Sequence, residues 1–318
     1  MVTFLDFEKP LAELEGRIEG LRQMSTDNDA KVADEVVKLE ERANQMVRSI
    51  YSKLTPWQKT LVARHPDRPH FENYIEELFV DFTELAGDRC FGNDLAIVGG
   101  LAEFRGQSVV VIGHEKGSDT ASRVAHNFGM ARPEGYRKAV RLMDLANRFG
   151  LPVITLVDTA GAYPGIDAEE RGQAEAIARS IEACLRLEVP LIAVIVGEGG
   201  SGGAVALASG NQVIMMEHSI YSVISPEGCA SILWHSSDNA EEAATALRLT
   251  AQDLLGLKVV DEVIEEPAGG AHRDRMHTIE SVGDAIERAL GGLDGLDGQE
   301  LKSHRREKFL AMGNLDNT

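Results

Sequence analysis

The sequence predicts an α/β fold in which helices cover both faces of a sheet, preceded by a helical arm. Two apolar runs, VITLVD (153–158) and LIAVIV (191–196), are each followed by a glycine-containing loop and a helical segment. Strands that are apolar at nearly every position are typical of sheets buried on both faces. Residues 4–54 place apolar side chains three or four positions apart, which predicts amphipathic helices.

The composition is that of a globular protein and excludes several classes. Of the 318 residues, 43% are hydrophobic and 26% are charged. No apolar run reaches the roughly 18 residues that a membrane span needs, and the N-terminal residues lack the layout of a secretory signal. The formal net charge of −19 disfavours general binding to nucleic acid or to an anionic membrane. Because Cys90, Cys184 and Cys229 lack the spacing of a disulfide framework or a metal site, we expect a cytoplasmic protein with no metal in this chain.

Residues 1–60 form the predicted arm. Two amphipathic helices are expected within residues 4–54, separated by the polar stretch STDNDA (25–30). Such helices can cover the protein's own core or bind another subunit, and the pattern favours neither. A proline-rich break, RHPDRPH (64–70), follows the arm, and a helix is expected over residues 71–86.

The central region, residues 61–295, carries the predicted sheet. Residues 96–104 and 108–117 are predicted to form a β-hairpin around the turn RGQ, and a basic helix is expected at 133–149. Strands and helices then alternate: strand 153–158, helix 171–187, strand 191–196, a short helix over 201–209, strands 212–217 and 219–224, and a helix at 226–234. Ser225 is predicted to be the N-cap of this last helix. Residues 296–318 are expected to be a charged C-terminal tail.

The stretch GEGGSGGA (197–204) between a strand and a helix fits three unrelated motifs. In the first, Gly197, Gly199 and Gly202 have the spacing of a dinucleotide-binding loop, with Glu217 about 20 residues on, where an acid meets the ribose. The helix that follows is short for that fold, so this interpretation is weak. A P-loop is excluded because no Gly-Lys-Ser/Thr follows.

The second interpretation is a nucleophilic serine and the third is a site for an oxyanion. Gly199, Ser201 and Gly203 match the loop around such a serine, but no later histidine has a distinctive context, and Ser201 is more simply a helix N-cap. In the third interpretation, Gly202, Gly203 and Ala204 begin a helix whose first N–H groups are unpaired. Glycine allows an oxygen atom to approach such groups closely, so an oxyanion hole needs no catalytic triad.

Longer words of the sequence resemble one family, the α subunits of bacterial acetyl-CoA carboxylase carboxyltransferase. The matching words run from residue 4 to about 275 and include FLDFEKPLAELE (4–15), IGHEKG (112–117), PEGYRKA (133–139), DTAGAYPG (158–165), EERGQAEAIAR (169–179), GEGGSGGA (197–204), YSVISPEGCASILW (221–234) and PAGGAHRD (267–274). Ala160 and Ala131 stand where the family usually has proline. Neither departure removes a group that the chemistry needs.

The resemblance implies a crotonase-like (ClpP/crotonase) fold of stacked ββα units, and GLKVVDEVI (256–264) is similar to the closing segment of such chains. It also implies a partner β subunit that carries zinc, an α2β2 assembly, a separate biotin carboxyl carrier protein and a separate biotin carboxylase. The implied reaction transfers a carboxyl group from carboxybiotin to acetyl-CoA and gives malonyl-CoA, the first committed step of fatty acid biosynthesis. Biotin would arrive on the carrier protein, since this chain has no Met-Lys-Met biotinylation site.

The resemblance also assigns roles to residues of the glycine stretch. Gly202 and Gly203, with Ala204 beside them, would form the oxyanion hole for the biotin ureido oxygen. The partner subunit would hold the thioester carbonyl and most of the CoA. No general-base side chain is required, because biotin freed of its carboxyl group can take the methyl proton. Gly203→Val is accordingly expected to fold and assemble but to lose most of the transfer.

Other residues are expected to play supporting parts. Gly161, Tyr163 and Gly165 either line the biotin channel or form tight turns and core. The basic residues either meet CoA phosphates or the carrier protein, or are solvated surface positions: Lys116, Arg123, Arg132, Arg137 and Lys138. Asp158 and Glu198 are expected to cap loops. A crotonase-like hydratase or decarboxylase acting alone remains an alternative, as does a binding subunit without catalytic activity.

Overall fold

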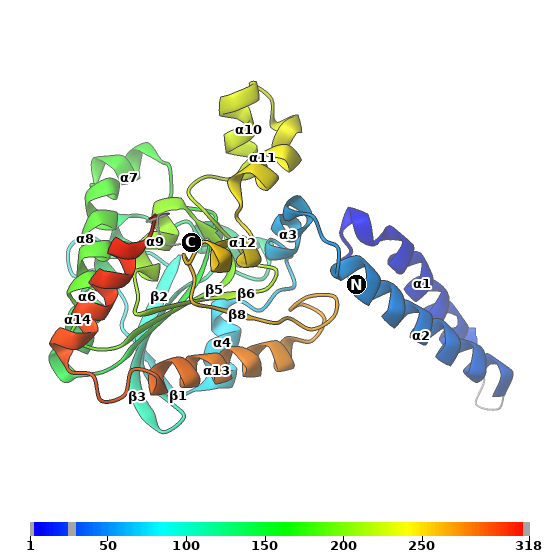
Figure 1. The fold of residues 1–318 in the computed structure, drawn as a ribbon, viewed down its shortest axis with the longest axis horizontal. Coiled ribbons are helices and arrows are strands. Elements are labelled where there is room, and N and C mark those ends of the chain that lie inside the picture. The colour runs from blue at the N-terminus through cyan, green and yellow to red at the C-terminus, as the bar shows by residue number, and fades with distance from the viewer. Residues whose placement is uncertain (1–2, 25–29, 314–318) are drawn as a thin grey trace.

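The computed structural model of the protein describes residues 3–24 and 30–313 (Figure 1). The predicted linker STDNDA lies, except for its last residue, outside these ranges. Within them the chain forms an eight-stranded mixed sheet with helices on both faces and two long helices extending to one side. The predicted α/β fold with an N-terminal arm is therefore confirmed.

The strand order of the sheet is β1-β2-β3-β4-β5-β6-β8, with β7 paired to the end of β5. The first three strands are antiparallel: β1 (Phe79–Glu84), β2 (Ile97–Phe104) and β3 (Gln107–His114). The others run parallel: β4 (Val153–Thr159), β5 (Leu191–Gly200), β6 (Gln212–Met216), β7 (Ile220–Ser222) and β8 (Glu262–Ile264). The predicted hairpin corresponds to β2 and β3.

The single helix expected over residues 71–86 is wrong. Helix α4 (Phe71–Leu78) ends after two turns, and the chain continues as strand β1. The residues of β1, FVDFTE, are mostly aromatic or β-branched and favour an extended backbone. Strand β2 supplies the partner, with Phe79 opposite Phe104. The paired residues lie 16 to 25 positions apart in the sequence, so local periodicity did not reveal the strand.

Helices cover the two faces of the sheet in separate layers. On one face, α6 (Pro133–Phe149), α8 (Gln173–Arg186), α9 (Ser201–Ala208) and α12 (Ala251–Gly256) pack on alternate residues of β5, such as Ala193. On the other face, α4 and α13 (Arg275–Gly291) pack on the intervening residues, such as Val194. Because side chains alternate along a strand, this explains why β5 is apolar at every position of its first half. The bounds of α6 agree with the predicted basic helix.

Three short helices and a two-helix projection complete the central region. The short ones are α3 (Pro56–Ala63), α5 (Thr120–Ala125) and α7 (Ile166–Glu170). Helices α10 (Pro226–Trp234) and α11 (Ala240–Leu247) stand away from the sheet (Figure 1). The Ser225 side chain accepts the Gly228 N–H at 3.1 Å, which confirms the predicted N-cap.

The arm consists of α1 (Lys9–Met24) and α2 (Ala30–Tyr51), which lie side by side and project from the body (Figure 1). Their buried side chains, among them Leu11, Ile18 and Val47, form an apolar cluster of their own together with Val62. The helices therefore pack mainly on each other and do not cover the sheet. At the base of the arm, the Tyr51 hydroxyl donates to Glu8 at 2.9 Å.

The C-terminal segment forms helix α14 (Gly298–Ala311) and packs on the body. Leu301 joins the apolar cluster beneath the sheet. Arg305 is fully buried and donates to the Val189 carbonyl at 3.0 Å and to the side chain of Asn211. The segment that the sequence predicted as a charged tail thus contains a helix that packs on the body through Leu301 and Arg305.

One buried ion pair fastens the proline-rich break to the sheet. Arg68 and Glu266 form two parallel hydrogen bonds of 2.8 Å, and their side chains are 3% and 0% exposed. Arg68 also donates to the carbonyl of Val196 in β5, and Glu266 accepts the N–H groups of His218 and Ala271. Burial alone would raise the pKa of Glu266, but the Arg68 charge and these hydrogen bonds outweigh it and lower the pKa to about 2.

Glu266→Gln is expected to destabilise the protein by about 3–5 kcal/mol, because it leaves the Arg68 charge buried without its partner. The pKa of Glu266 lies below its ordinary value, so its contribution is present at neutral pH and is lost as the pH falls from about 4.5 towards 2. The free energy of unfolding, measured by urea denaturation of both proteins between pH 7 and 3, should therefore converge at the acid end. A constant difference across this range would contradict the assignment.

Candidate active site

The candidate site lies where strand β5 passes into helix α9. The strand extends beyond its predicted end at residue 196, continues to Gly200 and pairs with β7. The short β7 strand is the partner that the sequence did not indicate at this position. Gly200, not Ser201, occupies the N-cap position, and Ser201 begins the helix with a φ of +49°. The expected N-cap role of Ser201 is therefore wrong.

The first turn of α9 presents unpaired backbone donors. The N–H groups of Ser201, Gly202 and Gly203 precede the first intrahelical hydrogen bond, and within the described part of the chain no side chain caps this end. The N–H of Ala204 is the first that the helix itself can use. The helix dipole adds positive potential at the same point. We call the N–H groups of Gly202 and Gly203 the oxyanion site.

The loop after β4, residues 159–165, lies directly against this turn, and we call it the site loop. The Thr159 hydroxyl donates to the Gly161 carbonyl at 2.8 Å, and Gly161 has a φ of +146°. A Cβ atom on Gly203 would lie 2.8 Å from the carbonyl carbon of Gly161 and 2.9 Å from the nitrogen of Ala162. The backbone of α9 therefore lies against the backbone of the site loop at this point, which explains the glycine at position 203.

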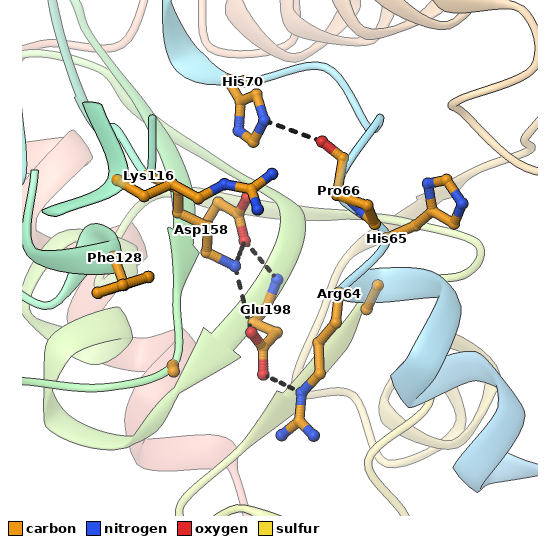
Figure 2. A pocket seen from close by; sticks show the side chains of 11 residues that line it. Arg64, His65, Pro66, His70, Lys116, Phe128, Asp158 and Glu198 are labelled. Carbon is orange, nitrogen blue, oxygen red and sulfur yellow. Dashed lines mark hydrogen bonds and ion pairs between the residues drawn. The ribbon is translucent and has the colours of Figure 1, made fainter. Parts of the chain in front are cut away.

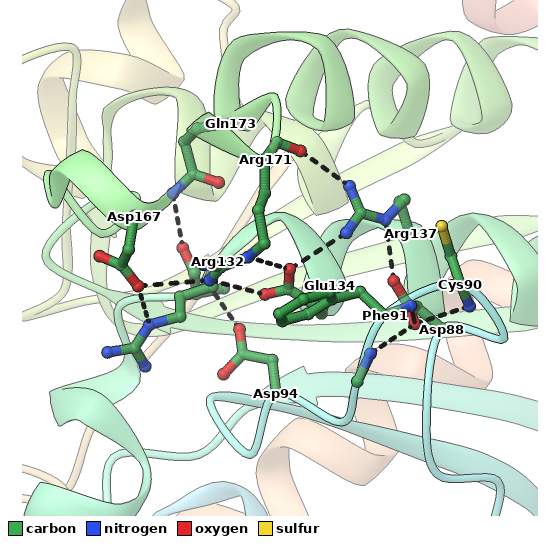
Figure 3. Close-up of polar contacts among 12 residues, drawn as sticks. Asp88, Cys90, Phe91, Asp94, Arg132, Glu134, Arg137, Asp167, Arg171 and Gln173 are labelled. Carbon is green, nitrogen blue, oxygen red and sulfur yellow. Dashed lines mark hydrogen bonds and ion pairs between the residues drawn. The ribbon is translucent and has the colours of Figure 1, made fainter. Parts of the chain in front are cut away.

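A set of interior contacts holds the site loop in place (Figure 3). The Gln173 amide donates to the carbonyls of Tyr163 and Ala131, each at 2.9 Å, and the Tyr163 N–H donates to the same Ala131 carbonyl at 3.0 Å. The Arg132 guanidinium lies 4.3 Å from the centre of the Tyr163 ring and 3.4 Å from Asp167. Sequence analysis did not single out Gln173, since its role depends on the packing of α8 against the loop.

Gly165 belongs to the same supporting structure. A Cβ atom on it would come within 2.1 Å of the Tyr163 ring. This glycine therefore makes room for Tyr163 beside the oxyanion site.

Four charged side chains, two of them buried and two half-buried, lie beside the site loop and line a cavity of about 230 Å³ (Figure 2). The Lys116 ammonium contacts Asp158 at 2.6 Å and Glu198 at 3.2 Å, and Arg64 contacts Glu198 at 2.6 Å. Asp158 also accepts the Glu198 N–H at 2.8 Å. The carboxylates expected to cap loops are thus chiefly members of an ion-pair network.

The network favours the charged forms of Lys116, Arg64 and Glu198. Burial would raise the pKa of the Glu198 carboxyl, but the positive charges of Lys116 and Arg64 outweigh burial and lower it. Burial would lower the pKa of Lys116, and Asp158 and Glu198 reverse this effect. The Glu198 carboxylate therefore stays ionised near neutral pH and is not poised to accept a proton.

The other basic residues serve mostly the interior. Lys138 is fully buried and donates to the carbonyls of Asp94 and Ile97 at 2.8 and 2.6 Å. Both alternatives for this residue, a contact with a phosphate or the carrier protein and a solvated surface position, are therefore wrong. Arg137 pairs with Asp88 at 2.8 Å and with Glu134 at 3.1 Å (Figure 3). Arg123 donates to the Gly117 carbonyl at 3.3 Å and lines the cavity beside Lys116.

An apolar pocket of about 400 Å³ opens on the other side of the oxyanion site. Gly202 and Ser201 stand at its edge, and the remaining walls are predominantly apolar: Val205, Tyr221, Ser222, Val223, Leu247, Leu254 and Val259. Such a pocket with a few convergent donors fits a mostly neutral ring system that carries one polar oxygen.

Residues 3–24 and 30–313 contain no group of three or more His, Cys, Asp or Glu side chains placed to hold a metal ion. None of the helices described there is long and apolar enough to cross a membrane.

The fold is that of the crotonase-like carboxyltransferases. The chain superimposes on transcarboxylase 12S, a hexamer solved with methylmalonyl-coenzyme A, with a TM-score of 0.57 and 20% identity over 72% of this chain and 42% of that one. It superimposes equally well on a chain of a Pseudomonas malonate decarboxylase hetero-tetramer in complex with coenzyme A, with 17% identity over 70% of this chain and 86% of that one. The expected crotonase-like fold is confirmed.

The family follows from the sequence comparisons. The family model for acetyl co-enzyme A carboxylase carboxyltransferase-like proteins matches residues 4–313. A relative from Paramagnetospirillum magneticum, named acetyl-coenzyme A carboxylase carboxyl transferase subunit alpha, is 64% identical over 97% of this chain and 98% of its own length. A relative of the same name from Sphingopyxis alaskensis is 62% identical over 98% of this chain and 99% of its own length. The chain belongs to the family of acetyl-CoA carboxylase carboxyltransferase α subunits.

Gly203→Ala is expected to lower the stability by about 1–3 kcal/mol, because its methyl group would displace the Gly161–Ala162 backbone. This contact also argues against the expectation that Gly203→Val folds without cost. Gly202→Ala is the matched control, since its methyl group would lie 3.4 Å from Ile177 in ordinary contact. Urea denaturation should show a lower midpoint for Gly203→Ala only. Equal midpoints for the two variants would contradict the close approach of loop and helix.

Proposed function

We propose that this chain is one half of a carboxyltransferase, active with a β subunit in an α2β2 assembly. The complete enzyme transfers a carboxyl group from carboxybiotin, borne by a biotin carboxyl carrier protein, to acetyl-CoA and releases malonyl-CoA. A biotin carboxylase recharges the carrier. The name that the family's α subunits carry supports this proposal, since a subunit alpha implies a complementary partner.

The observation that carries the proposal is the pair of free donors at the start of α9. The N–H groups of Gly202 and Gly203 hold the ureido oxygen of biotin, which gains negative charge as the carboxyl group leaves. The bound carboxybiotin supplies the activated carboxyl group. The apolar pocket beside Gly202 accommodates the rest of the ring system, whose surface is mostly neutral. One donor of this kind contributes about 3 kcal/mol to the stabilisation of the transition state.

The reaction develops negative charge at a second place, on the thioester oxygen of acetyl-CoA. The oxyanion site of this chain serves one oxygen, so a second site is needed on the partner subunit. The partner also holds most of the CoA and the zinc expected of the family. In this division of labour, Lys116, Arg123, Arg132 and Arg137 chiefly stabilise the walls of the site through their contacts with interior carboxylates, carbonyls and Tyr163.

The charge network speaks against a hydratase that acts alone. A hydratase needs two carboxylates that exchange protons with substrate. The two beside the site loop, Asp158 and Glu198, are already engaged in ion pairs with Lys116 and Arg64. Carboxyl transfer requires no such pair, because biotin freed of its carboxyl group can take the proton from the methyl carbon.

The isolated chain is expected to show no transfer from malonyl-CoA to biocytin, because it stabilises only one of the two developing charges. Addition of the β subunit should restore the reaction, which can be followed by the release of acetyl-CoA. The control is the β subunit alone. Full activity of this chain without its partner would contradict the shared site and favour the single-subunit alternative.

Gly202→Val is expected to fold normally and to reduce transfer in the complex by about 100-fold, the cost of one lost donor. Its Cβ atom would make ordinary contact with Ile177, and the side chain at the edge of the apolar pocket keeps the ureido oxygen from the N–H groups. Gly291→Val is the control, since nothing lies within 4 Å of a Cβ at that position in α13. A Gly202→Val rate within a few-fold of wild type would contradict the oxyanion site.

A further inference from the structure

One buried hydroxyl group next to the oxyanion site has no partner. Tyr136 lies in α6, its side chain is 0% exposed, and its ring belongs to the apolar cluster beneath α9. A Cβ atom on Gly203 would lie 3.1 Å from the Tyr136 oxygen, on the same side as the Gly161–Ala162 peptide. The hydroxyl therefore lies close to the point where the site loop touches the first turn of α9. Among the residues that the structure describes, nothing accepts or donates a hydrogen bond to it.

Such a group is costly for the folded chain. A polar group buried without a hydrogen bond destabilises a protein by about 1–3 kcal/mol, and a phenylalanine of nearly the same shape would avoid this cost. Tyrosine hydroxyl groups in protein interiors usually find a partner. The presence of this hydroxyl is explained if it gains a hydrogen-bond partner in another state of the protein. The relevant state is the one in which an oxyanion is bound at the oxyanion site.

The surroundings also decide the chemical role of the hydroxyl. Burial, reinforced by the negative charge of Asp94, raises the pKa of Tyr136, so the group stays protonated and can donate. The neighbouring site loop offers backbone oxygens as acceptors. The Gly161 carbonyl already accepts from Thr159, but a carbonyl oxygen has two lone pairs and can accept a second hydrogen bond.

We propose that Tyr136 is a positioning residue for the oxyanion site, whose hydroxyl donates a hydrogen bond to the backbone of the site loop when the loop closes on a bound oxyanion. The bond holds the Gly161–Ala162 peptide against Gly203, and thereby aims the two N–H groups of the oxyanion site while charge develops. Tyr136 acts through the loop and does not touch the substrate. This inference rests on the proposed carboxyl transfer.

The test compares Tyr136→Phe with wild type in the complete complex with the β subunit. The variant removes one oxygen atom and keeps the ring that packs under α9. Its kcat for transfer from malonyl-CoA to biocytin should fall about 10-fold, the equivalent of one hydrogen bond, while the KM for biocytin stays within about two-fold. Its melting temperature should equal or exceed that of wild type. If the hydroxyl had a purely structural role, Tyr136→Phe would lower the melting temperature and leave kcat unchanged.

Tyr74→Phe is the matched control. Tyr74 is also fully buried, but it lies in α4 on the opposite face of the sheet, and its hydroxyl contacts the sulfur of Met216 at 3.6 Å. This variant should keep the wild-type kcat. An active wild-type complex with a Tyr136→Phe kcat within about two-fold of it would overturn this inference alone. A wild-type complex without any transfer would overturn the proposed function and this inference with it.

Discussion

The backbone of helix α9 touches the backbone of the site loop, and this contact exists only because positions 200 and 203 have no side chain. A Cβ atom on Gly200 would lie 2.2 Å from the Ala160 oxygen, closer still than the corresponding distances at Gly203. The contact joins the ends of two neighbouring parallel strands, where open α/β sheets commonly place their ligands. The strand order, the positive φ of Gly161 in the loop, and the layer of α6 and α8 all serve to hold these two backbones together.

The basic side chains near this contact are directed at interior groups of the protein and not at a substrate. A chain with a net charge of −19 could present its few cations to an anionic substrate, yet Lys116, Arg137 and Lys138 are directed at interior carboxylates and carbonyls. Burying ions is costly unless each one finds a partner. Lys116 and Arg137 are ion-paired, and Lys138 donates to two backbone carbonyls. In the proposed site, the positive potential offered to a substrate oxygen comes instead from uncharged peptide groups, which need no counter-ion and titrate at no accessible pH.

The sequence allowed prediction of those elements whose signal is local. The buried strands β4 and β5, the hairpin of β2 and β3, the full length of α6 and the Ser225 cap all follow from periodicity, glycine turns and capping chemistry. Strand β1 was missed because its pairing partner is remote in the chain, and the end of β5 was misjudged because glycine usually indicates a turn. The parts played by Gln173 and Tyr136 depend on how two helices and a loop pack together, so no pattern within either helix could reveal them. The density of glycine in residues 197–204 indicated a close approach of some group to the backbone but fitted three motifs. The resemblance to a family, and not the pattern itself, selected the oxyanion interpretation, which stays a prediction.

Helix α14 bears on the strand that leads to the candidate site. Arg305 donates to Val189, just before β5 begins, and to Asn211, just before β6. The strand whose far end passes into α9 is therefore secured at its near end by a residue more than a hundred positions later in the chain. If α14 detached from the body, the Val189 carbonyl and the Asn211 side chain would lose this donor. The geometry at the start of α9 thus depends in part on a helix that packs at the opposite end of the same strand.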